Sequence, residues 1–329
     1  MKPLTSGMRP LGAPTLDEIR AARERIAGVT VRTPLVRLNA DVPGEIWLKL
    51  ENLQPIGSFK LRGAANAMRQ AGPERLAEGV YTASAGNMAQ GVAWSARQFG
   101  VQATVVVPEH APATKIAAIE RLGGKVLKVP FDRWWQVLQE HEYPDLSGLF
   151  IHPVADRAVM AGNGTAALEI LEDLPDPEAI DAVLVPFGGG GLSCGIAAAF
   201  EALRPGVPVW GCEVATAAPL AASLAAGEAQ TIDYQPSFVD GIGGKSLLPE
   251  MWPLVSRLLA GSKVVPLDEV AAAVRLLAER NRVIAEGAGA TPVAAALASA
   301  EKGKKVVCVV SGGNIDLAKL GAILEGRVP

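Results

Sequence analysis

The sequence has few cysteines and little net charge. Its three cysteines are Cys194, Cys212 and Cys308, and they form no C-x-x-C pair. Paired spacing is typical of disulfide frameworks and cysteine metal sites, so we interpret all three as small buried apolar residues in a reducing compartment. The formal net charge is −3, and no basic stripe or lysine-rich run occurs. We therefore expect neither nucleic acid nor a membrane surface as a partner.

Long apolar runs are also absent. Stretches such as Ala182-Val183-Leu184-Val185 are far too short to span a bilayer, and the first residues lack the apolar segment of a signal peptide. We therefore expect a soluble, cytoplasmic protein. Hydrophobic residues make up 49% of the chain, and its 329 residues suffice for one large or two ordinary domains with ample core.

Short apolar strands alternate with longer helical segments. The pattern predicts strands at 46–50, 80–83, 103–107, 125–129, 182–186, 207–213 and 305–310, and helices that include 61–70, 192–203 and a long one near 268–285. A capping box at Thr15-Leu16-Asp17-Glu18 predicts a helix through about Ile26. Strands separated by helices imply parallel sheets with helical crossovers, so we predict an α/β fold.

Lys60 is the first candidate for chemistry. It lies between Phe59 and Leu61, soon after the predicted strand 46–50. A lysine between an aromatic and an apolar residue is poorly placed for a solvated surface charge. Burial favours the neutral amine, which is a nucleophile that can form a Schiff base.

The second candidate is the run Gly188-Gly189-Gly190-Gly191-Leu192, between a predicted strand and a predicted helix. Glycines let backbone N–H groups converge, and the start of the helix adds a favourable dipole, so the run predicts an anion site. A tight strand-to-helix turn needs one or two glycines, and four in a row exceed that need.

A dinucleotide-binding fold is a rival interpretation of the same loop. Glu213 follows the loop by about 20 residues, the spacing of an acid that binds a ribose. The third glycine of G-x-G-x-x-G is missing, however, because that position falls on Ser193 or Cys194. The rival also leaves Lys60 and Ser311 without a role. We rank a nucleotide-dependent oxidoreductase well below a site built on Lys60.

Ser311-Gly312-Gly313-Asn314 forms the third motif. It follows the apolar strand 305–310, so Ser311 stands at the carboxyl end of a strand, where ligands bind in open α/β sheets. A serine that caps the next helix is locally just as plausible.

Together with Ser84-Ala85-Gly86-Asn87-Met88-Ala89-Gln90-Gly91, these motifs resemble the fold-type II pyridoxal phosphate enzymes. The nearer resemblance is to the serine/threonine dehydratase and serine racemase branch, including the catabolic threonine dehydratases. It extends from Arg32-Thr33-Pro34-Leu35 to Ser311-Gly312-Gly313-Asn314. It implies two open, mostly parallel twisted sheets with helices on both faces, as in the tryptophan synthase β chain. It also implies a homodimer, a large cofactor-binding domain of residues 1–52 plus 154–329, and a small mobile domain of residues 53–153.

The resemblance also implies roles for single residues. Lys60 is expected to hold pyridoxal 5′-phosphate as a Schiff base and later to remove the Cα proton of the substrate. The expected cofactor contacts are Phe59 on one face of the ring, Asn87 beside the ring hydroxyl, Ser311 at the pyridine nitrogen, and Gly188, Gly189, Gly190, Gly191 and Leu192 at the phosphate. The substrate carboxylate is expected at Ser84, Ala85, Gly86, Asn87 and Met88.

The implied activity is that of an ammonia-lyase, or dehydratase, which converts a β-hydroxy α-amino acid to a 2-oxo acid and ammonia. An amino-acid racemase is the alternative. Racemases of this branch place a second serine where Ala85 stands, and alanine cannot transfer a proton. We expect no regulatory domain after Pro329.

The substrate is predicted to be threonine, serine or a bulkier 3-substituted serine such as phenylserine. Two departures from the relatives favour the bulkier group. Met88 replaces a common histidine and is expected to make the pocket more apolar, and the run His152-Pro153-Val154-Ala155-Asp156 is altered.

A metal site is not expected. Glu213 matches a glutamate that binds a divalent cation in racemase-like relatives, but Pro219 stands at the accompanying aspartate position, and such a site needs several oxygen donors. Glu213 is thus a weak candidate, and a monovalent cation bound by carbonyls remains open. His152 is assigned a structural role at the domain junction.

Overall fold

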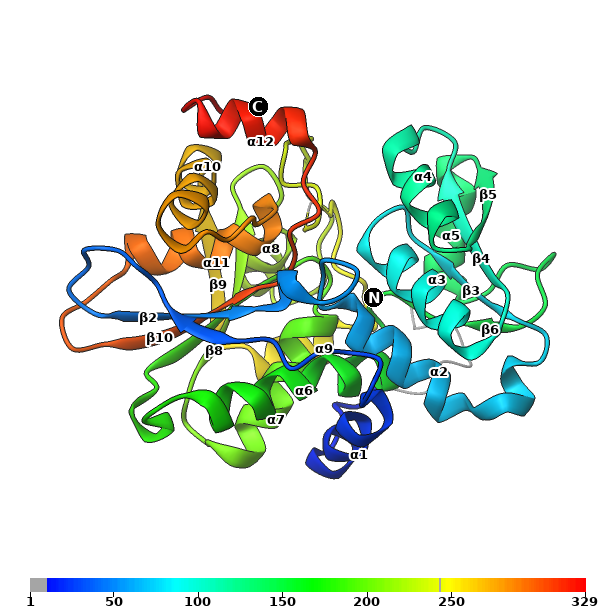
Figure 1. Ribbon diagram of the computed structural model, residues 1–329, viewed down its shortest axis with the longest axis horizontal. Coiled ribbons are helices and arrows are strands. Elements are labelled where there is room, and N and C mark those ends of the chain that lie inside the picture. Colours follow the sequence, from blue (N-terminus) through cyan, green and yellow to red (C-terminus); the bar gives the residue numbers. More distant parts are fainter. Residues whose placement is uncertain (1–10, 243) are drawn as a thin grey trace.

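The computed structural model describes residues 11–242 and 244–329, and their strands form two separate sheets (Figure 1). The six-stranded sheet has the order β1 (Leu35–Arg37), β2 (Glu45–Leu50), β10 (Lys305–Val310), β7 (Ala182–Pro186), β8 (Val209–Val214) and β9 (Gly261–Val265). The four-stranded sheet has the order β5 (Lys125–Val129), β4 (Ala103–Pro108), β3 (Val80–Ala83) and β6 (Leu149–Phe150). Every pairing is parallel except that of β1 with β2. The predicted α/β fold with two mostly parallel sheets is confirmed.

Helices cover both faces of the six-stranded sheet (Figure 1). One group is α1 (Leu16–Ile26), α6 (Arg157–Asp173), α7 (Gly191–Leu203) and α9 (Trp252–Leu258), and the other is α10 (Leu267–Leu276), α11 (Gly287–Ala298) and α12 (Leu317–Leu324). α8 (Pro219–Ala226) follows β8, and it lies with α9 in the connection from β8 to β9. The helices α2 (Lys60–Leu76), α3 (Asn87–Phe99), α4 (Ala113–Arg121) and α5 (Phe131–Glu140) belong to the lobe of the four-stranded sheet.

The core follows the alternation of side chains along buried strands. In β7, Val183 and Val185 pack into the cluster that contains residues of α6, α7 and α9. Leu184, between them, packs into the cluster formed with α10 and α11. Successive side chains of a strand point to opposite faces, so a strand buried on both sides is apolar at every position.

Of two predictions about helix ends, the structure confirms one and contradicts the other. The capping box is present: the Thr15 N–H donates to Glu18 Oε2 at 2.7 Å, and the Glu18 N–H donates to Thr15 Oγ1 at 3.2 Å. The single long helix predicted near 268–285 is wrong, because α10 ends at Leu276 and a π-helical turn, Leu277–Asn281, follows. There the Asn281 side chain accepts from the Asn39 N–H at 3.0 Å and donates to the Arg37 carbonyl at 3.1 Å. These bonds to the β1–β2 hairpin compete with continuation of the helix.

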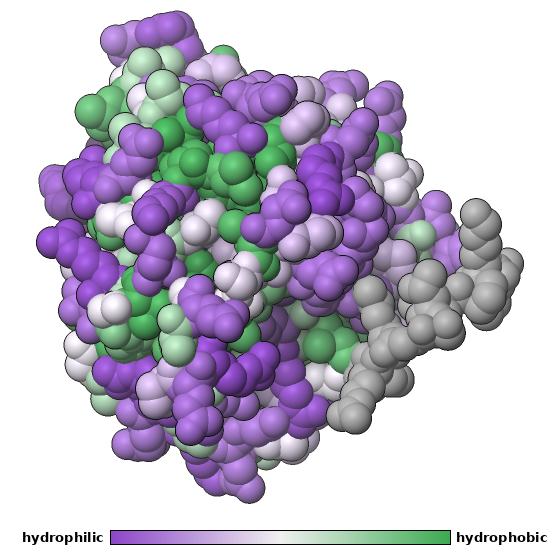
Figure 2. All heavy atoms as spheres, turned by 90° about the vertical axis from the view of Figure 1, so that its right-hand side faces the viewer, coloured by the Kyte–Doolittle hydropathy of each residue, from purple (hydrophilic) through white to green (hydrophobic). Residues whose placement is uncertain are grey.

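The four-stranded sheet uses only strands between Val80 and Phe150, as expected for a domain inserted into a larger one. The boundaries at residues 53 and 153 stay a prediction. All three cysteines are free and buried, in agreement with the interpretation from sequence. Of the described helices, none is both long and apolar enough to cross a membrane. On the side of the four-stranded sheet, the surface is mostly hydrophilic with hydrophobic patches between (Figure 2).

Candidate functional site

Lys60 is the first residue of α2 and is only partly exposed. Its Nζ donates a hydrogen bond to the Pro153 carbonyl at 2.7 Å and lies 5.2 Å from the centroid of the Phe59 ring. Burial lowers the pKa of Lys60 to about 8, against the opposing charge of Glu286. A substantial fraction of the amine is therefore neutral and nucleophilic near physiological pH.

The Ser311 motif lies directly against the segment that precedes Lys60. The Phe59 N–H donates to the Ser311 carbonyl at 3.0 Å, and the Gly313 N–H donates to the Gly57 carbonyl at 2.9 Å. An isolated antiparallel bridge joins Ser58 to Gly312. Ser311 itself is buried at the carboxyl end of β10. Two motifs from distant parts of the chain thus lie side by side, and their shared role as one cofactor site stays a prediction.

The glycine loop connects β7 to the start of α7, and its conformation requires glycine at Gly190, where φ is 101°. Among the described residues, none accepts a hydrogen bond from the backbone N–H groups of residues 188–193. These groups lie at the N-terminus of a helix, where donors and dipole together favour a negative ligand. The geometry supports the predicted phosphate site.

The glycine loop also packs tightly against Val154. A Cβ atom added at Gly189 would lie 2.9 Å from both methyl groups of Val154, and one added at Gly191 would lie 3.0 Å from the Val154 carbonyl oxygen. Pro153 contacts Lys60, and Val154 contacts the glycine loop. One short segment therefore adjoins both the predicted aldehyde site and the predicted phosphate site.

The asparagine loop joins the same site from the four-stranded sheet. Asn87 begins α3, its Nδ2 donates to Glu286 Oε1 at 2.9 Å, and its Oδ1 accepts from Asn314 Nδ2 at 2.8 Å. Ser84, Ala85 and Gly86 precede it and are half-buried. The loop therefore lies beside the Ser311 motif. Within the described part of the chain, no acceptor binds the backbone N–H groups of residues 87–89 at the start of α3.

Met88 differs from its neighbours in the loop. Its side chain is 1% exposed and packs in the core between α2, α3 and β3, with Met68 and Val92. This placement argues against the expectation that the Met88 side chain makes the substrate pocket more apolar. The predicted role of the loop in binding a carboxylate concerns its backbone and stays a prediction.

Glu286 is a site residue that the sequence reasoning missed. It is buried, and burial together with the charge of Asp240 raises its pKa to about 7, while the bond from Asn87 opposes the rise. A Cβ atom at Gly312 would lie 2.6 Å from Glu286 Oε1, so Gly312 makes room for this carboxyl group. The signal in the sequence was an acid followed by the small residues of Glu286-Gly287-Ala288-Gly289-Ala290, which bury it.

A second missed feature is a network of buried charges beneath α2. Arg62 donates to Glu51 at 2.7 and 2.8 Å and to Glu169 at 2.7 Å through each of two nitrogens. Lys49 Nζ donates to Glu169 at 2.6 Å and to the Thr33 carbonyl at 2.6 Å. Buried charges are tolerated when they are paired in this way. The network ties the turn of α2 that carries Lys60 to β2 and α6.

Glu213 has a structural role in this arrangement. Its two carboxyl oxygens accept from the N–H groups of Leu220 and Ala221, at 2.8 and 2.9 Å, and from the Ser262 hydroxyl at 2.7 Å. It thus caps the N-terminus of α8. The side chain is fully buried, so neither oxygen faces a ribose, which removes the main support for the dinucleotide interpretation.

The residues present fit the cofactor that the resemblance implies. The N–H groups of residues 188–193, which have no acceptor among the described residues, suit a phosphate. An amine with a lowered pKa suits an aldehyde, and Ser311 adds a hydroxyl beside the segment that precedes Lys60.

Comparisons with known proteins agree with this geometry. Residues 26–312 match the family described as pyridoxal-phosphate dependent enzyme. The chain is 41% identical to an L-threonine ammonia-lyase of Thermotoga maritima, over 94% of this chain and 78% of that protein. It is 36% identical to a catabolic L-threonine dehydratase of Staphylococcus aureus, over 94% and 92%. Among solved structures, maize serine racemase has a TM-score of 0.85 at 32% identity, with 95% and 98% of the chains covered. Threonine deaminase isoform 2 from Solanum lycopersicum has a TM-score of 0.83 at 32% identity, covering 98% and 99%.

Proposed function

The chain belongs to the family of pyridoxal-phosphate dependent enzymes, and we propose that it is an ammonia-lyase that converts a β-hydroxy α-amino acid to a 2-oxo acid and ammonia. The observation that carries the proposal is the position of the Lys60 amine. Its pKa is about 8, and it bonds to Pro153 in the segment that touches the glycine loop. The residue before it, Phe59, bonds to Ser311 at the carboxyl end of β10.

Pyridoxal phosphate supplies an aldehyde that joins the substrate amine and a ring that withdraws electrons from Cα. The N–H groups of the glycine loop would hold its phosphate, and Lys60 its aldehyde carbon. Ser311, with a neutral hydroxyl, would meet the ring nitrogen, which then stays largely unprotonated. A ring with an unprotonated nitrogen withdraws electrons less strongly. It therefore favours rapid loss of a β-substituent over a long-lived negative charge at Cα.

The protein's own groups perform the proton transfers. The neutral Lys60 amine would take the Cα proton of the bound substrate, as its lowered pKa allows. The β-hydroxyl would then leave as water with the proton that Lys60 took from Cα. The released enamine would take up water to give the 2-oxo acid and ammonia. The N–H groups at the start of α3 would orient the substrate carboxylate.

L-Threonine and L-serine are the proposed substrates. Relatives named as threonine ammonia-lyases and dehydratases support this choice. The burial of Met88 in the core removes one of the two reasons for a bulkier substrate such as phenylserine. A cytoplasmic location and a homodimer remain predictions.

An amino-acid racemase is the second candidate, because solved serine racemases share the fold with high TM-scores. Racemisation needs an acid that returns a proton to the face of Cα opposite Lys60. Ala85, in the loop that begins α3, offers no such group. The elimination reaction is therefore preferred.

The test combines a spectrum with product detection. The purified protein is titrated with pyridoxal phosphate and then given L-threonine, L-serine or L-threo-phenylserine. We expect a visible absorbance band, 2-oxo acid release, and the highest kcat/KM for threonine or serine. A band without 2-oxo acid release from any of the three would reject the lyase proposal. Faster turnover of phenylserine would overturn the substrate assignment alone.

A further inference from the structure

The segment 152–155 connects Lys60 with the glycine loop, and the side chain of His152 defines its shape. His152 Nδ1 accepts hydrogen bonds from the Val154 N–H at 3.0 Å and from the Ala155 N–H at 2.6 Å. An acceptor that binds N–H groups two and three residues ahead is the arrangement by which Asp, Ser and Thr side chains hold turns. Here the buried imidazole of His152 is the acceptor that holds the turn.

These bonds also determine the state of the ring. Since Nδ1 accepts twice, it carries no proton, and the proton of the neutral ring lies on Nε2, which donates to the Leu138 carbonyl at 3.1 Å. Burial and the neighbouring His141 and Lys60 lower the pKa of His152 to about 3, so the ring is neutral at physiological pH. Both nitrogens are engaged. His152 is therefore not available to bind a metal ion together with the nearby His141 and Glu250, the one such group among the described residues.

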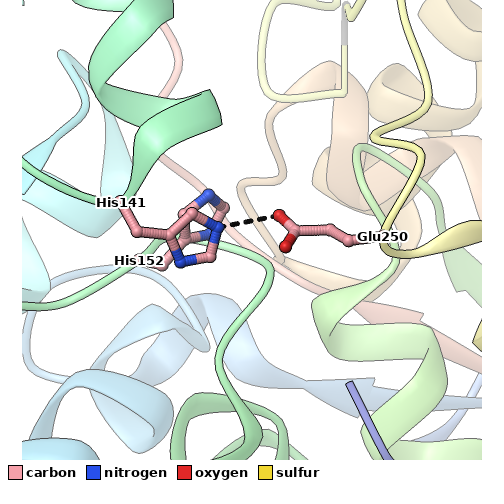
Figure 3. Close-up of side chains that lie close together, drawn as sticks. All are labelled: His141, His152 and Glu250. Atoms are coloured by element: carbon pink, nitrogen blue, oxygen red, sulfur yellow. Dashed lines mark hydrogen bonds and ion pairs between the residues drawn. The ribbon is translucent and has the colours of Figure 1, made fainter. Parts of the chain in front are cut away.

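The ring is also held by its neighbours. The His141 ring stacks on it with centroids 4.4 Å apart and planes inclined by 25°, and His141 Nε2 lies 2.8 Å from Glu250 Oε1 (Figure 3). His141 and Leu138 belong to the end of α5, whereas Glu250 precedes α9. The position of His152 is thus fixed from both lobes.

We propose that His152 is a positioning residue, which places the Pro153 carbonyl against the Lys60 amine and Val154 against the glycine loop. The essential feature is the acceptor at Nδ1, because it holds the N–H groups of Val154 and Ala155 and thereby the intervening backbone. Without it, the buried N–H of Ala155 and the partly buried N–H of Val154 lose their partner, and the segment relaxes. The Lys60 amine and the phosphate site then shift relative to each other.

Three substitutions separate this role from simple packing. Asn at position 152 offers an oxygen near the place of Nδ1, Gln offers an amide nitrogen near the place of Nε2, and Ala offers neither. Packing volume ranks Gln above Asn, whereas the proposed role ranks Asn above Gln. His110→Asn is the matched control, because His110 is exposed at the turn between β4 and α4.

Each full-length variant is titrated with pyridoxal phosphate, and the dissociation constant is read from absorbance. We expect His152→Asn to stay within about threefold of the wild type, whereas His152→Gln and His152→Ala bind about tenfold more weakly through the loss of one buried hydrogen-bond acceptor. With L-threonine, kcat of the Gln and Ala variants should fall by about 100-fold, the effect of a displaced catalytic group. His110→Asn should match the wild type.

A Gln variant that equals or exceeds the Asn variant in cofactor affinity would overturn the proposal, and so would wild-type behaviour of all three. If the Ala variant does not fold, the order of Asn and Gln still decides. The kinetic measurement rests on the proposed function, but the affinity measurement does not. A wild type that binds the cofactor without releasing 2-oxo acid would refute the function and leave the test of His152 intact.

Discussion

Asn87 Nδ2 lies 2.9 Å from Glu286 Oε1, which joins the first residue of α3 to the residue that immediately precedes α11. The contact connects the lobe of the four-stranded sheet with that of the six-stranded sheet. The same carboxyl group acts electrostatically on Lys60, whose pKa it raises against the effect of burial. Glu286 therefore combines contact across the two lobes with control of the reactive amine.

Glu286→Gln should lower the pKa of Lys60 below about 8, because it removes the charge that favours the ammonium form. The apo-protein is labelled with a trace of acetic anhydride over a range of pH, and the labelling of Lys60 is measured by mass spectrometry. His110→Asn serves as a control. An unchanged titration of Lys60 would show that the two groups are not coupled.

The same variant should change how stability depends on pH. The pKa of Glu286 is raised to about 7 in the folded protein, so the folded state binds more protons than the unfolded state between the ordinary carboxyl pKa and about 7. The free energy of unfolding of the wild type should therefore fall relative to Glu286→Gln as the pH rises through this window, by about 3 kcal/mol at most. Urea titrations of both proteins at pH 5 and pH 7.5 measure the difference. If the free energy of unfolding changed equally in the two proteins between pH 5 and pH 7.5, the raised pKa of Glu286 would be contradicted.

Arg62→Lys should destabilise the fold by about 3 kcal/mol, because one ammonium cannot satisfy two buried carboxylates held by a guanidinium fork. Arg157→Lys is the matched control. Arg157 pairs with Glu18 at 2.7 Å, but its side chain is 44% exposed. The substitution should therefore lower the free energy of unfolding by less than about 1 kcal/mol. Chemical denaturation measures both. An equal loss of unfolding free energy in the two variants would show that the buried network does not stabilise the fold more than a surface ion pair does.

Gly189→Ala should weaken cofactor binding about tenfold, since the added methyl group meets Val154 at 2.9 Å and pushes the loop away from its position. Gly321→Ala, in α12, is the control, because its added methyl group meets no atom within 4 Å. Titration with pyridoxal phosphate compares the two. Cofactor affinity that is equal in Gly189→Ala and the wild type would show that the loop does not hold the phosphate.

Ala85→Ser should raise the rate at which L-serine is converted to D-serine. The substitution places a hydroxyl group where racemases of this branch have the second serine, which transfers the proton. Chiral chromatography of the products, with 2-oxo acid release measured in parallel, gives both rates. The ratio of racemisation to elimination should rise over that of the wild type. An unchanged ratio would show that Ala85 does not determine which reaction occurs.

Local motifs sufficed to predict which contiguous segments lie close together in the fold. Lys60, the glycine run and Ser311 each occur next to a strand that an apolar pattern identifies, and the sheets bring them together as expected. Chemistry between distant residues could not be read in this way. Pro153 is 93 positions from Lys60, and Glu286 is 199 positions from Asn87.

Two further features depended on tertiary contacts. The direction of the Met88 side chain is set by its packing against α2, which the loop motif does not specify. The π-helical turn that follows α10 ends at Asn281, whose side chain bonds to the β1–β2 hairpin. In both cases long-range packing prevailed over a local pattern.

The most direct test compares the wild type with Lys60→Ala, each supplied with pyridoxal phosphate and L-threonine, by visible absorbance and 2-oxo acid release. The wild type should show the absorbance band of the attached cofactor and release 2-oxo acid. The variant should lose both, because the substitution removes the amine that would join the cofactor aldehyde. A Lys60→Ala protein that kept its band and its full activity would contradict the proposed mechanism outright.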